Sequence, residues 1–174
     1  DHHWEDQGPP EAPDTSKLST LLRYFRRGDF VCETTTQFIP TGGQILEGGC
    51  GLGQHVKSLP LLGYSTTGID FAEQTVAKVK RLSPSLDIRV GDVRKLPFED
   101  SCFDGYWSLG VIEHFWEGFN DIAHEMARVI RSDGYLFLTF PSMSWLRTFK
   151  AGRSMYPLWG CSDKPSNFYQ FALD

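Results

Sequence analysis

A glycine-rich segment and three acidic residues carry the chemistry that this sequence could perform. Residues 47–53 read EGGCGLG, beginning with Glu47, and Asp70 and Asp92 each follow a later apolar stretch. Glycines let a backbone turn with positive φ and approach a ligand closely, because no Cβ intervenes. Carboxylates accept hydrogen bonds from ribose hydroxyls or pair with a cationic group. The set therefore predicts a pocket for a nucleoside that carries a positive charge.

Two common glycine-rich phosphate loops do not match this segment. A dinucleotide-binding GxGxxG pattern would require a third glycine where Gln54 or Val56 stands. A P-loop requires Gly-Lys followed by Ser or Thr, and the sequence has no such tripeptide. Glu47 would repel a phosphate, whereas it suits an ammonium or a sulfonium group. These observations argue against a pyrophosphate ligand.

The elements that must position these residues follow a regular alternation after the Gly42-Gly43 break. Expected strands cover residues 44–47, 65–69, 86–90, 103–108 and 135–140, and expected helices cover residues 54–62, 72–82 and 120–130. Strands separated by helices of about ten residues indicate parallel strands with helices on both faces. The sequence predicts a doubly wound, mostly parallel α/β sheet, with the acids along the carboxyl ends of its strands.

Segments on either side of this core have a different character. We divide the chain into an N-terminal arm with lid helices (residues 1–40), a cofactor-binding α/β core (41–141) and an aromatic-rich segment for substrate binding or cover (142–174). Within the first segment, Tyr24 and Phe25 are candidate substrate contacts. The neighbouring His2 and His3 lie in a polar terminus without a further ligand, so no metal site is expected.

Composition narrows the classes of function further. The 174 residues fit one domain, with 40% hydrophobic and 22% charged residues. A net charge of -5 disfavours a sequence-independent nucleic-acid binder. The chain has no apolar run long enough to cross a bilayer. Its four cysteines are scattered without a Cys-x-x-Cys pair, which favours a reducing compartment, and we expect a cytoplasmic protein.

The order and spacing of several motifs resemble those of a known family. The segment 47–53, Asp70, the Gly91-Asp92 pair, the turn LPF at 96–98 and VIEH at 111–114 are together similar to class I S-adenosylmethionine-dependent methyltransferases. The resemblance covers residues 44–141. It implies a Rossmann-like fold, S-adenosyl-L-methionine as cofactor and S-adenosyl-L-homocysteine as product. The implied reaction moves a methyl group to an O, N or C atom of a small organic acceptor by in-line displacement.

The resemblance also implies roles for residues at the first two strands. Glu47 would help to anchor the amino group of the methionine part. Gly49 and Gly51 would let the backbone pass close to it. Asp70 would accept hydrogen bonds from the ribose hydroxyls, and Phe71 would pack on the adenine face.

Further roles are implied at the third and fourth strands. Asp92 would accept a hydrogen bond from the exocyclic amine of adenine, and the Val93 backbone N–H would donate to the ring. Ser108 and Leu109 would border the methionine end. His114 would lie just beyond them and is the candidate general base, because an imidazole exchanges protons near neutral pH.

Simpler structural interpretations compete with these roles. Asp70 could only cap the following helix, Asp92 could only form a turn, Phe71 could be core, and His114 could be a helix-end histidine. Gly48 departs from the family, which has an apolar side chain there. We expect this departure to loosen the strand end or to let a helix pack closer.

Alternative functions stay open at this point. A methyltransferase of proteins or other macromolecules is one, although the acidic balance disfavours a nucleic-acid substrate. Ser108-Leu109-Gly110 also replaces the Asn/Asp-Pro-Pro-aromatic motif that marks methylation of base or amide nitrogens. A non-catalytic cofactor-binding module is another. The family's two last strands have no counterpart after Pro141, so residues 142–174 or a second copy in a homodimer would cover the fifth strand, or the chain is a fragment.

Overall fold

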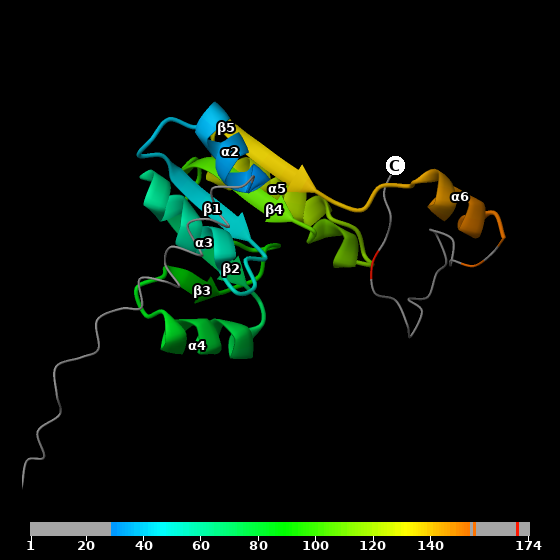
Figure 1. Cartoon of the computed structure of the whole chain (residues 1–174), viewed down its shortest axis with the longest axis horizontal. Helices are drawn as coiled ribbons and strands as arrows, with labels where there is room; N and C mark the ends of the chain where they lie inside the picture. The colour runs from blue at the N-terminus through cyan, green and yellow to red at the C-terminus, as the bar shows by residue number, and fades with distance from the viewer. Residues whose placement is uncertain (1–28, 154, 156–169, 171–174) are drawn as a thin grey trace, which may run out of the picture.

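A five-stranded parallel sheet forms the centre of the computed structural model, which describes residues 29–153, 155 and 170 (Figure 1). The strand order is β3-β2-β1-β4-β5. The strands are β1 (Gln44–Gly48), β2 (Ser65–Asp70), β3 (Ile88–Val90), β4 (Phe103–Leu109) and β5 (Ile130–Thr139). The predicted doubly wound sheet is confirmed. Tyr24, Phe25 and the helix expected over residues 17–25, which contains both, lie outside the described residues. The division into three segments stays a prediction.

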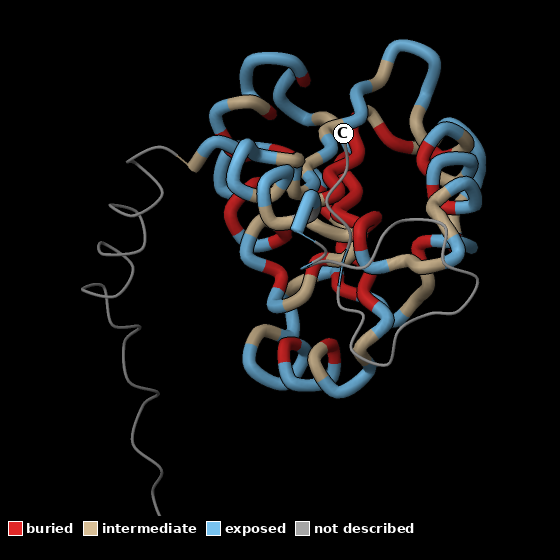
Figure 2. Tube along the Cα trace, turned by 90° about the vertical axis from the view of Figure 1, so that its right-hand side faces the viewer, coloured by how far each residue is buried: buried red, intermediate tan, exposed pale blue. Residues whose placement is uncertain are grey.

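Helices cover both faces of this sheet. They are α2 (Phe30–Phe38), α3 (Gln54–Ser58), α4 (Glu73–Leu82) and α5 (Asn120–Val129), with 3-10 turns η1 (Leu59–Leu62) and η2 (Ile112–His114). A further helix, α6 (Trp145–Ala151), follows β5 and lies beyond the sheet (Figure 1). Val31 of α2 packs with Ile45 and Trp107 on one face, whereas Met126 of α5 packs with Leu46 on the other. Buried residues accordingly form a central band with exposed helix surfaces outside it (Figure 2).

Several elements differ from the sequence prediction. The helix expected over residues 54–62 divides into α3 and η1, and β3 begins at Ile88 instead of residue 86. β5 begins at Ile130, directly after α5, because residues 131–134 form an irregularity between the pairs Phe103–Ile130 and Gly105–Tyr135. A Cβ on Gly134 would lie 2.6 Å from the Ile130 side chain, so glycine permits this bend. The helix α6 was not expected at all. Its aromatic residues obscure the helical period within the segment 142–174.

Tyr106 explains the departure at Gly48. The side chain of Tyr106 crosses from β4 and its hydroxyl occupies the space that a Cβ on Gly48 would need. Tyr106 is fully buried, and its hydroxyl oxygen has no hydrogen-bond partner among the described residues. In the family, an apolar side chain of β1 fills the space at this position. Here the side chain of Tyr106, on the neighbouring strand β4, fills it instead.

We predict that Gly48→Ala lowers the free energy of unfolding by about 1–3 kcal/mol, the usual cost of overpacking a core. The same substitution should cost less in a Tyr106→Phe background, because the nearest clashing atom is then absent. Urea denaturation of the wild type, both single variants and the double variant measures this coupling. An equal cost of Gly48→Ala in both backgrounds would contradict the proposed contact.

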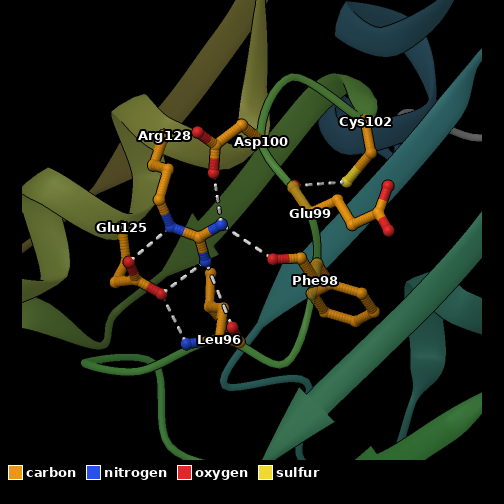
Figure 3. A network of polar contacts seen from close by, with 7 residues as sticks. All are labelled: Leu96, Phe98, Glu99, Asp100, Cys102, Glu125 and Arg128. Carbon is orange, nitrogen blue, oxygen red and sulfur yellow. Dashed lines mark hydrogen bonds and ion pairs between the residues drawn. The ribbon is translucent and has the colours of Figure 1, made fainter.

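Arg128 at the end of α5 joins this helix to the loop between β3 and β4 (Figure 3). Its guanidinium donates to both carboxylate oxygens of Glu125 (2.7 and 2.8 Å), to Asp100 (2.9 Å) and to the carbonyls of Phe98 (2.7 Å) and Leu96 (3.1 Å). These contacts use all five guanidinium N–H groups. Glu125 also accepts from the Leu96 backbone N–H at 2.6 Å. The network fixes the loop that follows Asp92 and Val93.

Arg128→Lys should lower the free energy of unfolding by about 1–3 kcal/mol, because an ammonium cannot reproduce the planar fork and leaves backbone carbonyls unpaired. Arg131→Lys is the matched control. Arg131 makes an ion pair with Asp104 at a half-exposed position, so this change should cost less than about 1 kcal/mol. Equal losses in chemical denaturation would show that the fork geometry of Arg128 is unimportant.

Candidate active site

A cavity of about 520 Å³ opens at the carboxyl ends of the strands. It is lined by Gly49, Asp70, Phe71, Gly91, Asp92, Val93, Arg94, Gly110, Val111, His114 and Phe115. These residues come from the loops that follow β1, β2, β3 and β4. This edge is where ligands bind in open parallel sheets, next to the point where the chain reverses its strand order.

The cavity brings together six of the residues predicted for cofactor and acceptor: Gly49, Asp70, Phe71, Asp92, Val93 and His114. Glu47, Gly51, Ser108 and Leu109 do not line it. Ser108 is fully buried, and its hydroxyl has no hydrogen-bond partner among the residues that the structure describes. Leu109 packs on the α2 side of the sheet. The roles implied for these four residues stay predictions.

Asp70 connects three elements through one carboxylate. One oxygen accepts from the Gly51 backbone N–H at 2.7 Å, and the other accepts from the Ala72 N–H at 2.9 Å, before α4. The simple capping interpretation is wrong, because Ala72 is the N-cap of α4 and the helix has no side-chain cap hydrogen bond. Asp70 instead holds the backbone just before the helix together with the glycine segment. Asp70 is buried, yet it lines the cavity. A carboxylate offers about four lone-pair positions, so two hydroxyl donors can still be accepted.

Gly49 is required by the packing around it, in addition to the close approach of its backbone to a ligand. Its φ is +74°, and a Cβ there would overlap the side chain of Val111, which lines the cavity from the loop after β4. Its backbone N–H donates to the Ile69 carbonyl at 2.8 Å. The β1 loop and the β4 loop therefore meet at a position where only glycine fits.

Glu47 is a buried carboxyl group without a full set of partners. It is 4% exposed, and its Oε2 has no hydrogen-bond partner among the described residues. Burial raises the pKa of Glu47 to about 8, with smaller contributions from Asp29 and Asp70, while the Val56 backbone N–H acts in the opposite direction. Such a group favours a nearby cation, because a positive charge would stabilise its ionised form.

Asp92 is already engaged within its own loop. Its carboxylate makes a two-oxygen contact with the Arg94 guanidinium (2.6 and 3.0 Å) and accepts from the Arg94 backbone N–H at 2.8 Å. The hydrogen bonds from Arg94 lower the pKa of Asp92. The turn interpretation is therefore confirmed by the bond to the Arg94 backbone N–H, and the role of Asp92 toward adenine stays a prediction.

Sequence reasoning missed Arg94, Gly110 and Phe115. The Arg94 guanidinium lies over the Phe115 ring, 5.4 Å from its centroid, and both line the cavity. Gly110 has a φ of +67° and turns the chain from β4 toward η2. A glycine directly after a predicted strand was the available signal for Gly110, whereas the Arg94–Phe115 contact joins two loops and had no local signal.

Phe71 and His114 both present exposed side chains to the cavity. Phe71 is 80% exposed, which rules out the core interpretation. His114 is the last residue of η2. The exposed ring of Phe71 follows the buried carboxylate of Asp70 in the sequence. Such a pair can bind a nucleoside, since the ring can pack on a base and the carboxylate can accept hydrogen bonds from a sugar.

Comparison with known proteins agrees with this geometry. A family model described as a methyltransferase domain matches residues 46–138, which include the strands and loops around the cavity. The chain belongs to the class I S-adenosylmethionine-dependent methyltransferases. This methyltransferase domain is 32% identical over 130 residues to a probable S-adenosylmethionine-dependent methyltransferase of Mycolicibacterium smegmatis, covering 75% of this chain and 49% of that protein.

Further relatives and solved structures extend the comparison. A phthiotriol/phenolphthiotriol dimycocerosates methyltransferase of Mycobacterium tuberculosis is 32% identical over 131 residues, covering 73% of this chain and 46% of that protein. The methyltransferase domain thus spans about half the length of these curated relatives. A solved methyltransferase of Methanosarcina mazei aligns with a TM-score of 0.62 and 25% identity, over 70% of this chain and 63% of that one.

The described helices of the domain include none with the length and apolarity needed to span a bilayer.

Glu47 predicts a pH dependence of stability. Its carboxyl ionises near pH 8 in the folded protein and near its ordinary value of 4.5 when unfolded, so the folded state binds more protons between these values. The free energy of unfolding should therefore fall as pH rises through this range, by up to about 1.4 kcal/mol per pH unit from this group. Glu47→Gln stays neutral and should give a flatter profile in chemical denaturation between these values. Parallel profiles would contradict the assignment.

Proposed function

We propose that the cavity binds S-adenosyl-L-methionine and that the domain transfers its methyl group to a small organic acceptor. The observation that carries this proposal is the succession of Asp70 and Phe71 at the end of β2. A buried carboxylate and an exposed ring line the same cavity and match the ribose and adenine of a nucleoside. The unpartnered Oε2 of Glu47 fits the cationic methionine end of the same cofactor.

Each residue then has a defined task. Asp70 accepts from the ribose hydroxyls, Phe71 packs on the adenine, Asp92 accepts from the adenine amine and the Val93 backbone N–H donates to the ring. Gly49 and Gly51 leave room for the methionine part, and Glu47 anchors its amino group. Ser108 and Leu109 border that end of the cofactor.

When bound, the cofactor would supply an electrophilic methyl group attached to its sulfonium sulfur. In-line attack on this methyl group would leave the sulfur as a neutral thioether. The protein aligns the acceptor and excludes water from the site. Where the acceptor is a hydroxyl, His114 removes its proton, since this imidazole lies at the cavity wall. Tyr24 and Phe25 are proposed to contact the acceptor from the N-terminal side.

The class of acceptor has one further candidate. The named function of the mycobacterial dimycocerosate methyltransferase favours a lipid as a second candidate acceptor for this domain. Methylation of a protein or another macromolecule, and a non-catalytic cofactor-binding role, are the alternatives. A homodimer and a cytoplasmic location stay predictions.

Phe71→Ala should weaken S-adenosylmethionine binding by about 2- to 12-fold, corresponding to about 0.5–1.5 kcal/mol for one aromatic contact. Since Phe71 is largely exposed, the thermal midpoint should stay unchanged. Leu82→Ala removes another exposed apolar side chain (69% exposed) away from the cavity and should leave the affinity unaltered. Calorimetric titration of the three proteins measures the effect.

The same titrations separate the alternatives. An absence of binding by well-folded wild type would overturn the proposed cofactor site. Equal affinities for wild type and Phe71→Ala would contradict the proposed position of the adenine. Binding without formation of S-adenosylhomocysteine against small-molecule and lipid acceptors would favour the non-catalytic module.

A further inference from the structure

The helix α6 presents an apolar surface to solvent. Trp145 is 82% exposed, Phe149 51% and Leu146 44%. With about 100° between successive helical residues, these three side chains fall within one arc of roughly 100°. Ser144 caps the helix by accepting from the Arg147 backbone N–H at 3.4 Å. Large apolar side chains gathered at one exposed place mark an interaction surface, whereas scattered ones do not.

Cations border this apolar arc. Lys150 and Arg147 occupy the next part of the helix circumference, and the Arg153 guanidinium lies 4.2 Å from the centroid of the Phe149 ring. From residue 134 to residue 162 the sequence has these three cations and no acidic residue, although the whole chain has a net charge of -5. The described residues of α6 and its two flanks, from 140 to 153, therefore carry basic side chains and no acidic one, in a chain with a net negative charge.

The position of α6 connects this surface with the active site. β5 ends at Thr139 and leads toward α6, which extends beyond the carboxyl edge of the sheet, away from its body (Figure 1). The cavity opens at the same edge, where the strands end. A surface that engages α6 would thus lie toward the edge of the sheet at which the cavity opens.

We propose that α6 docks the domain on an anionic lipid surface. Trp145, Leu146 and Phe149 enter the boundary between headgroups and acyl chains, while Arg147, Lys150 and Arg153 contact lipid phosphates. Aromatic and apolar residues on one face with basic residues beside them suit such an interface. The proposal deepens the proposed function, since a docked domain reaches an acceptor held in that surface. The docking itself requires no catalysis.

Flotation with vesicles tests the docking directly. Vesicles of phosphatidylglycerol and phosphatidylcholine should bind the full chain, with at least tenfold weaker binding to pure phosphatidylcholine and at high salt. Arg147→Glu/Lys150→Glu should reduce binding to the anionic vesicles at least tenfold. Lys78→Glu/Arg81→Glu on α4 changes the same charge at the same spacing and should have less than a threefold effect.

A second pair of variants tests the apolar contribution. Trp145→Ala/Phe149→Ala should lower vesicle binding at least tenfold, whereas Leu61→Ala/Leu62→Ala, also exposed, should not. No binding by wild type, or equal losses in the α6 and control pairs, would overturn the proposal. Cofactor titration of the same variants keeps the two proposals apart, because the α6 variants should retain wild-type affinity for S-adenosylmethionine even where docking is lost.

Discussion

The carboxylate of Asp70 is the interaction on which the site depends. It ends β2, receives the Gly51 N–H from the loop after β1 and receives the Ala72 N–H before α4. The loop it holds contains Gly49, whose packing against Val111 brings in the loop after β4. The loops that line the cavity are thus joined by two residues. Asp70 connects the loop after β1 to the start of α4, and Gly49 packs against the loop after β4. Because backbone N–H groups already hold the Asp70 carboxylate in place, it needs little rearrangement to accept a ribose.

Three acids lie at the carboxyl ends of neighbouring strands or just beyond them, and the domain gives each a different environment. Asp70 is held by backbone N–H groups. Asp92 is paired with Arg94, which lowers its pKa. Glu47 is buried and its pKa rises to about 8, so it is largely neutral near pH 7. A cationic ligand would remove this penalty at Glu47, which links the electrostatics of the folded domain to the charge of its cofactor.

Much of this arrangement could be predicted from local pattern. The alternation of apolar stretches predicts the positions of the strands. The glycines and acids follow these strands, and because the carboxyl ends of parallel strands lie at one edge of the sheet, their position predicts a binding site there. The unpredicted features join residues far apart in the sequence: Tyr106 fills the space over Gly48, Arg94 pairs with Asp92 while lying over Phe115, and the bend before Tyr135 extends β5. Such contacts have no local periodicity. The helix α6 was missed because its aromatic residues resembled a covering segment.

The most direct test of the cofactor site is a crystal structure of the domain with S-adenosylhomocysteine. The ribose hydroxyl oxygens should lie about 2.6–3.2 Å from the Asp70 carboxylate, and the adenine should pack on Phe71. The amino group should point toward Glu47. The hydrogen bonds from Gly51 and Ala72 to Asp70 should be retained. A nucleoside bound elsewhere, or one in this cavity without contact to Asp70, would contradict the account.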